Sequence, residues 1–429
     1  MIVLLSRGRV LSLSLISSGL WLTPKRVYWY PKVFFSISLA LWVAYVLTGH
    51  GGLDFRGHPI GTDFSSFWAA SSLVLSGHAG DAYDQIKHYE AQQAHFGEGV
   101  QYYAWFYPPS ALLLVAPLGI LPYLPALIIW LAATGAAYVA TVYRFIQRAD
   151  AIIPILCFPA VLINTIHGQN AFLSTAIVGT GLLMSDRRPF AAGLILGTLC
   201  FKPQLAPMLA VVVVARMNWK MALGAALSVC SLLISATLIF GLEVWQQFAS
   251  IVPVSAMWLE YGVMGFAKMQ SAFATVRLLG GGIGLAYSIQ ALVTISIAVL
   301  LFMIWRTSAS PRLRAGATGA AILLGTPFLL DYDLVLLSLP IAALAAEGLE
   351  NGFRPYERTA LACAWLLPLM ARPAGFAHIP LSPEVVACLL VLIWRRTTKK
   401  EPKAVKPPGD AVPANQSQAT STSATTRHC

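Results

Sequence analysis

The sequence predicts an all-α polytopic membrane protein, and three observations support this prediction. Hydrophobic residues make up 57% of the 429 positions, and charged residues only 11%. The mean hydropathy of +0.68 is far above that of soluble globular domains. Apolar runs recur along the chain, separated by short breaks that contain charged residues, proline or glycine. Such runs can cross or half-cross a bilayer as helices and are too long for the strands of a membrane β-barrel.

Hydropathy predicts about 10–12 transmembrane or half-spanning helices. Proline breaks the passage 108–143, which we expect to form a half-helix followed by a span. Lys202 and Pro203 separate the short runs 189–201 and 205–215, so we expect two discontinuous helices that meet inside the membrane. The other expected helices are residues 33–48, 151–166, 171–184, 221–241, 284–305, 316–330, 333–346, 359–371 and 383–394.

The distribution of lysine and arginine predicts the orientation. If the N-terminus is cytoplasmic, only six of the 29 basic residues fall in outer segments, namely Arg56, Lys87, Lys202, Lys268, Arg277 and Arg372. The positive-inside rule expects this bias. We therefore expect a cytoplasmic or interfacial segment at residues 1–32, a multi-pass domain at 33–396 with a long first outer loop at 49–105, and a disordered cytoplasmic tail at 397–429. The long outer loops indicate that the protein acts on the extracytoplasmic face.

The net charge of +11 follows from the lysine and arginine residues that flank the expected spans on the cytoplasmic side. It does not indicate nucleic-acid binding, which favours basic residues clustered on one soluble domain. Five of the six cysteines lie in apolar runs and Cys429 ends the chain, so neither a disulfide framework nor a thiolate metal site is expected. We expect no cofactor and no protein-bound metal, and a requirement for a divalent metal stays open.

An acidic stretch in the first outer loop, GTDFSSFWAASSLVLSGHAGDAYD at residues 61–84, is unusual in so apolar a chain. Hydrophobic residues after Asp63 follow a helical period with serines between them, which predicts a helix along the outer interface. Asp63 would either cap this helix or act as a functional carboxylate, and its position alone favours neither. Asp54, Asp81 and Asp84 are weaker candidates in the same loop.

Further candidates lie in the following passages. The aromatic cluster 105–107 is typical of an interfacial belt, although it can also line a groove for a polyprenyl chain or a sugar. His167, Gln169 and Asn170 form a polar outer turn. Lys202 lies between two apolar half-helices, where an ammonium group is costly; it is either functional or reaches the interface by snorkelling.

The ordered motifs GTDFSSFW, YPPSALLLVAPLGILP, HGQNAFL, DRRPFAAGLILGTLCFKPQLA and LLDYDLVLLSLP resemble glycosyltransferase family 87. These bacterial proteins are similar to polyprenol-phosphate-mannose-dependent mannosyltransferases of the C-type (GT-C) superfamily. The resemblance runs from Asp63 to Pro340 and is best between His167 and Gln204. It implies a GT-C-like fold in the bacterial cytoplasmic (inner) membrane.

The resemblance implies transfer of a sugar, mannose by the family's name, from a polyprenyl-phosphate donor to a hydroxyl of a glycan or glycolipid. Asp63 matches the acid of the superfamily's first outer loop and is the expected catalytic base, although Thr62 stands where a second acid is common. Lys202 is the first candidate for the donor phosphate, with Lys268 and Arg277 as alternatives. The expected substrate-binding residues are His167, Gln169, Asn170, Tyr107, Gln204 and Asp333.

Two other functions stay open. A multi-pass transporter or flippase of a lipid-linked or small polar substrate would also suit broken helices and an intramembrane lysine, but no inverted repeat relates the two halves of the sequence and transport needs no long outer loop. A lipid-linked polysaccharide polymerase or ligase is chemically close to the transferase and would use the same outer face.

Overall fold

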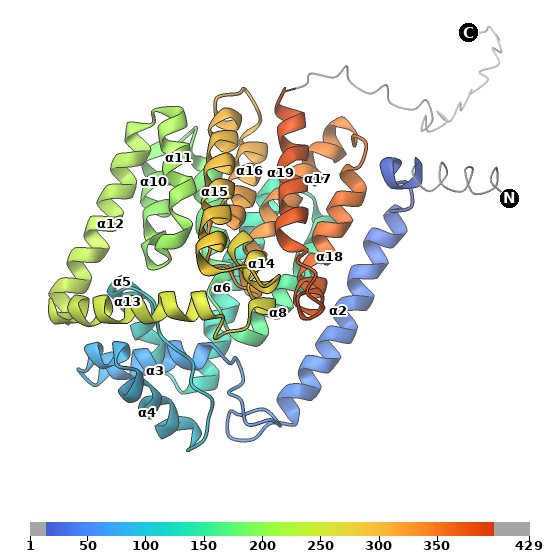
Figure 1. The fold of residues 1–429 in the computed structure, drawn as a ribbon. Coiled ribbons are helices and arrows are strands. Elements are labelled where there is room, and N and C mark those ends of the chain that lie inside the picture. Colours follow the sequence, from blue (N-terminus) through green and yellow to red (C-terminus); the bar gives the residue numbers. More distant parts are fainter. Residues whose placement is uncertain (1–13, 399–429) are drawn as a thin grey trace, which may run out of the picture.

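The computed structural model describes residues 14–398, and its regular secondary structure is helical, with three isolated β-bridges (Figure 1). The predicted N-terminal segment lies partly, and the predicted tail almost wholly, outside the described residues. The α-helices are α2 (Pro24–Leu47), α3 (Phe64–Leu75), α4 (Gln85–Phe96), α5 (Pro109–Val115), α6 (Tyr123–Ile146), α7 (Ile152–Leu156), α8 (Pro159–His167), α9 (Ala171–Met184), α10 (Pro189–Gly197), α11 (Pro207–Arg216), α12 (Trp219–Phe240), α13 (Glu243–Tyr261), α14 (Ala272–Leu278), α15 (Ile283–Trp305), α16 (Pro311–Gly325), α17 (Ser338–Asn351), α18 (Glu357–Phe376) and α19 (Ser382–Thr398).

The helix lengths confirm the predicted class, a polytopic all-α membrane protein. Within residues 14–398, six helices are long and apolar enough to span a membrane, and a seventh span results if the segments Ala149–Leu156 and Pro159–His167, bent by 50°, count together. Shorter apolar helices accompany them, including α3, α9 and α11. The predicted mixture of spanning and half-spanning helices is therefore present.

Several boundaries differ from the expected ones for identifiable reasons. Helix α2 begins at Pro24 rather than at residue 33, because Thr23 caps it by accepting a hydrogen bond from the backbone N–H of Arg26, and Pro31 is accommodated inside it. The passage 108–143 divides as expected, into α5 with a 3-10 turn and then α6. Helices α4 and α13 were not predicted, since polar residues interrupt their apolar runs.

The most buried helices form the centre of the bundle. Nearly all of α16 is buried, as is the 3-10 helix Asp331–Leu337 that leads into α17. Helices α12 and α15 instead carry exposed leucine and isoleucine side chains along most of their length, as lipid-facing helices do. Helix α16 and the segment that leads into α17 are therefore enclosed by the other helices.

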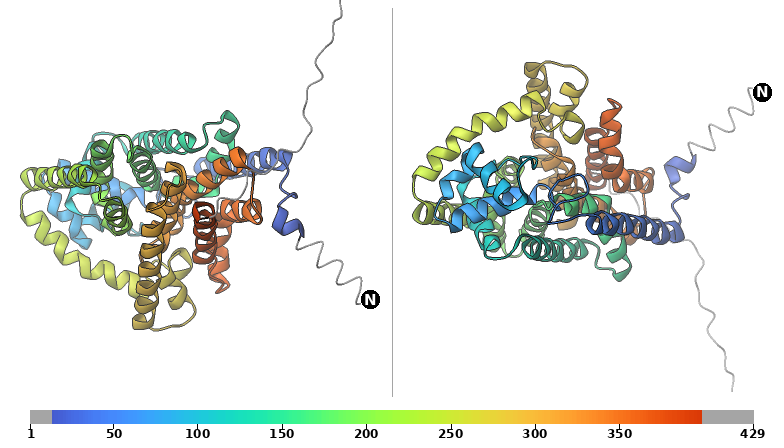
Figure 2. Two further views of the ribbon diagram at one scale, coloured as in Figure 1. Left: turned by 90° about the horizontal axis from the view of Figure 1, so that it is seen from above. Right: turned by 90° about the horizontal axis from the view of Figure 1, so that it is seen from below.

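The segments predicted to lie outside gather at one end of the bundle. Figure 1 shows α3, α4 and α13 together below the long helices, and the end-on views of Figure 2 show α13 (yellow-green) along the rim. Helix α3 lies crosswise there, but α4 and neighbouring segments cover its serine face, and most of its residues from Phe64 to Ser71 are buried. The helix expected at the interface is thus largely enclosed by neighbouring segments of the protein, among them α4, α5 and residues 116–120.

Helices α10 and α11 are the discontinuous pair expected on either side of Lys202. Each is too short to span a bilayer. Helix α10 packs against α9 and α12, and α11 packs against α15 and α16. Helix α10 packs with its backbone against α12, where a Cβ on Gly193 would lie 2.1 Å from the carbonyl oxygen of Met221. Such close packing of small residues holds α10 against α12 and thereby fixes the position of the turn between α10 and α11.

Candidate active site

Asp63 lies at the N-cap position of α3 but does not cap this helix. Its backbone is helical, and its side chain accepts no hydrogen bond from the first turn. Instead, Nε2 of Gln169 donates to Oδ2 at 3.0 Å, and Nδ1 of His167 lies 3.7 Å from Oδ1. The Nζ atom of Lys268 lies 4.0 Å from Oδ2. Capping therefore does not account for this carboxylate, which belongs to a polar cluster.

The neighbours of Asp63 stabilise its ionised form. Burial opposes ionisation, but the charge of Lys268, the nearby ring of His167 and the hydrogen bond from Gln169 outweigh it and hold the pKa of the carboxyl below its usual value. Its side chain is 16% exposed, so a small polar group can still reach it. Asp63 is thus an accessible anion at neutral pH, as a general base must be.

The turn that carries His167 and Gln169 is pressed directly against the start of α3. Gly168 has φ +62°, and a Cβ there would lie 2.5 Å from Cβ of Phe64, so glycine is required on both grounds. Nε1 of Trp130 donates to the carbonyl of Gly168 at 3.1 Å. This close approach brings residues from the end of α8 and the segment before α3 together.

Gln169 is held in one orientation. Its Oε1 accepts the backbone N–H of Asn170 at 3.2 Å and the hydroxyl of Tyr107 at 3.1 Å. Because a backbone N–H can only donate, Oε1 is the acceptor and Nε2 must point toward Asp63. Gln169 and Tyr107, expected to bind substrate, therefore orient the carboxylate in this structure.

Lys202 does not snorkel. It is 2% exposed, and its Nζ donates to Oδ1 of Asp333 at 2.5 Å. The other carboxylate oxygen of Asp333 accepts the backbone N–H of Leu330 at 3.2 Å. The charge of Lys202 is therefore balanced inside the protein, where an unpaired ammonium would be costly.

Tyr332 joins the two lysines into one site. Its ring centroid lies 5.4 Å from Nζ of Lys202 and 5.7 Å from Nζ of Lys268, distances at which a cation is attracted to an aromatic face. The ring of His167 meets it edge-on at 5.9 Å. Sequence reasoning missed Tyr332, although it lies beside Asp333 in the LLDYDLV motif.

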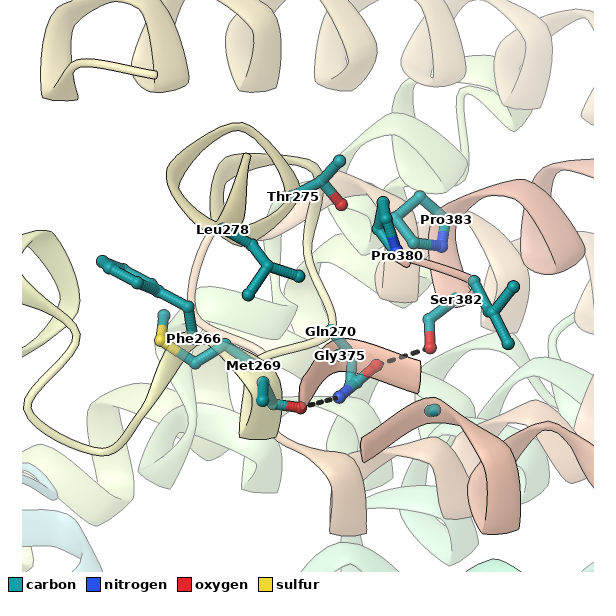
Figure 3. Close-up of a pocket in the computed structure, with 12 residues that line it drawn as sticks. Phe266, Met269, Gln270, Thr275, Leu278, Gly375, Pro380, Ser382 and Pro383 are labelled. Atoms are coloured by element: carbon teal, nitrogen blue, oxygen red, sulfur yellow. Dashed lines mark hydrogen bonds between the residues drawn. The ribbon is translucent and has the colours of Figure 1, made fainter. Parts of the chain in front are cut away.

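Lys268 reaches the site because its segment pairs with the chain before Tyr332. Gln270 donates its backbone N–H to the carbonyl of Leu329 at 2.9 Å, next to a bridge between Met269 and Leu330. The Gln270 side chain ties the segment to its surroundings, donating to the carbonyl of Ala267 and accepting from Ser382, which begins α19 (Figure 3). A small pocket lies between these residues and the end of α18.

The structure does not bring two of the expected residues into the cluster. The guanidinium of Arg277 donates to the carbonyls of Glu260 and Gly281 and lies over the ring of Phe266. Gln204 is half-buried in the turn after Lys202, and within the described residues no hydrogen bond joins it to the cluster. Arg277 thus stabilises the loop between α13 and α15.

The three weaker acidic candidates have structural roles. Asp54 accepts the backbone N–H groups of Arg56 and His58, each at 2.8 Å. Asp84 caps α4, and Asp81 pairs with Lys87 at 2.8 Å. Asp63 differs from all three because its partners come from distant segments of the chain.

No metal centre is found in the part of the chain that the structure describes. Within residues 14–398, no group of three or more histidine, cysteine, aspartate or glutamate side chains is arranged to hold a metal ion. The cysteines Cys157, Cys200, Cys230, Cys363 and Cys388 are free.

A family model for glycosyltransferase family 87 matches residues 105–330. This range covers more than half of the chain and includes His167, Gln169, Lys202 and Lys268. No curated protein and no solved structure matches the chain.

Proposed function

The chain belongs to glycosyltransferase family 87, and we propose that it transfers a sugar, mannose, from a polyprenyl-phosphate donor to a hydroxyl of a glycan or glycolipid acceptor. Transfer would take place on the extracytoplasmic face of a bacterial cytoplasmic membrane, with both termini in the cytoplasm. The biased distribution of basic residues supports this orientation.

The observation that carries the proposal is the ionised, partly exposed Asp63 with an ammonium group 4.0 Å away. In the proposed reaction, the acceptor hydroxyl gives its proton to Asp63 while its oxygen bonds to the anomeric carbon of the sugar. The bond between that carbon and the phosphate oxygen breaks, and its electron pair stays on the phosphate. A cation beside this oxygen stabilises the charge that develops there.

Lys268 suits the phosphate better than Lys202, the first candidate from the sequence. Lys202 is bound tightly to Asp333, and a phosphate would have to break that buried pair. Lys268 is 15% exposed, and its ammonium group makes a 4.0 Å approach to Asp63 and a 5.7 Å approach to the ring of Tyr332, with no hydrogen bond to a described residue. We therefore assign the phosphate contact to Lys268 and a positioning role, through Tyr332, to Lys202 and Asp333.

The test is sugar transfer by Asp63→Asn in proteoliposomes with a polyprenyl-phosphate sugar. Asparagine can keep the hydrogen bond from Gln169 but cannot take the proton, so we expect kcat to fall about a hundredfold to ten-thousandfold at equal protein abundance. Asp84→Asn is the matched control, because asparagine also caps helices and activity should be unchanged.

Either of two results would count against the proposal. Turnover by Asp63→Asn close to that of the unaltered protein would remove Asp63 as the base. Movement of intact donor across the bilayer with no release of polyprenyl phosphate would favour the transporter alternative.

A further inference from the structure

The two lysines of the site are held in opposite ways. Lys202 is buried in a bonded pair with Asp333 at 2.5 Å. Lys268 stands at the limit of an ion pair with Asp63, and within the described residues no hydrogen bond holds its Nζ atom. Its backbone, in contrast, is fixed by the pairing of Met269 and Gln270 with residues 329–330. The Lys268 side chain is thus a loosely held cation on a fixed support.

We propose that the donor phosphate competes with Asp63 for Lys268, so that donor binding frees the carboxylate to take the proton of the acceptor hydroxyl. The inference rests on the proposed function and adds an order to it: the base becomes active only after the donor has bound. A phosphate oxygen accepts stronger hydrogen bonds from an ammonium group than a carboxylate can make across 4.0 Å, so the exchange is favourable.

Lys268 is the neighbour of Asp63 that can respond to a ligand. The titratable groups acting on or beside Asp63 are His167, Lys268, Tyr103, Tyr107, Tyr123 and Tyr332. His167 is fixed by a 2.8 Å hydrogen bond to the hydroxyl of Thr62. Moving Lys268 to an anion removes the largest charge that holds the pKa of Asp63 down, while burial, which raises it, remains.

The charges balance through one cycle. Before the reaction, Lys268 neutralises the donor phosphodiester and Asp63 is anionic. During transfer, the acceptor proton moves to Asp63, and polyprenyl phosphate leaves with the electron pair of the broken bond, held by Lys268. When the product leaves, Lys268 returns to Asp63, which favours loss of the proton to water and restores the resting site.

The experiment measures protonation of Asp63 without requiring turnover. The full-length protein in nanodiscs is labelled with a hydrophobic carbodiimide, which reacts with protonated carboxyl groups, and modification of Asp63 is followed by mass spectrometry across pH. The probe ligand is polyprenyl phosphate. We expect it to raise the pH of half-maximal labelling by roughly one unit or more, the effect of losing an opposite charge at this distance.

Variants separate this effect from simple shielding of Asp63. Lys268→Gln should label at the higher pH even without ligand and show no further shift. Lys87→Gln, which removes an ammonium paired with Asp81 in the same loop, should behave like the unaltered protein. Shielding alone would lower the extent of labelling at every pH and leave the midpoint unchanged.

An unchanged midpoint on adding polyprenyl phosphate would overturn the inference, as would a Lys268→Gln variant that labels at the original pH. Both outcomes are independent of the transfer assay. A midpoint shift together with full turnover by Asp63→Asn would keep the competition for Lys268 but refute Asp63 as the base, so the two failures can be told apart.

Discussion

At the scale of single residues, Lys202 and Lys268 differ in burial and in pairing, and this difference is the basis of our proposal that Lys268 contacts the phosphate. Lys202 interrupts an apolar run, which made it the more conspicuous candidate in the sequence. Its partner Asp333 is distant in the sequence and visible only in the fold. Removing one partner of this buried pair would leave the other charge without compensation, so the two residues have to be replaced together.

Lys202→Met should therefore destabilise the protein by about 3–5 kcal/mol, because it leaves Asp333 buried without a counter-charge. Lys202→Met combined with Asp333→Asn should recover much of this loss, since asparagine can still accept the N–H of Leu330. Unfolding midpoints of the purified proteins in detergent would measure both effects. Equal stability of the single and double variants would show that the unpaired charge of Asp333 is not what destabilises Lys202→Met.

At the scale of helices, the position of Lys202 depends on the contact between α10 and α12. Gly193 and Gly224 let the two backbones touch, and a Cβ on Gly224 would lie 2.2 Å from the carbonyl oxygen of Phe190. Helix α10 leads through the 3-10 helix Thr198–Phe201 to Lys202. Widening this contact would shift the turn away from Asp333.

Gly193→Ala should lower stability by about 1–3 kcal/mol, since the added methyl group has no room and the helices must separate. Gly284→Ala in α15 is the matched control: nothing lies within 4 Å of its Cβ position, and alanine favours a helix by about 1 kcal/mol over glycine. The midpoints of thermal unfolding in detergent would compare the two variants with the unaltered protein. A Gly193→Ala protein as stable as the control would contradict the close packing.

Sequence patterns predicted apolar elements well and contacts poorly. The bounds of α9 and the break around Lys202 follow directly from hydropathy, because lipid and core burial select the same residues. Helix α13 was missed because polar residues such as Gln246, Gln247 and Ser250 interrupt its apolar run and lower the hydropathy of the window. The approach of Lys268 to Asp63 depends on a backbone pairing at residues 269–270 and 329–330, which no local pattern encodes.

At the scale of the whole molecule, the two ends of the helix bundle differ in their charged residues and in their structure. The carboxylate site lies at the end of the bundle that holds α3, α4 and α13. At the opposite end, Arg314 and Arg216 bind Asp186 in the turn between α9 and α10, and Arg396 binds Glu357 at the start of α18. This clustering of arginine is what the cytoplasmic end of a membrane protein is expected to contain.

Reporter fusions test the orientation on which the proposed function depends. A periplasmic reporter such as alkaline phosphatase should be active when fused after Gly97, which follows α4, and a cytoplasmic reporter such as green fluorescent protein should fluoresce after Arg188 or Arg396. Gly97 is exposed and Arg188 lies in the exposed α9–α10 turn, so both sites tolerate a junction. The two reporters at each site act as controls for each other. Cytoplasmic fluorescence from the Gly97 fusion would put Asp63 and Lys268 on the cytoplasmic side, where the proposed transfer to an extracytoplasmic acceptor could not take place.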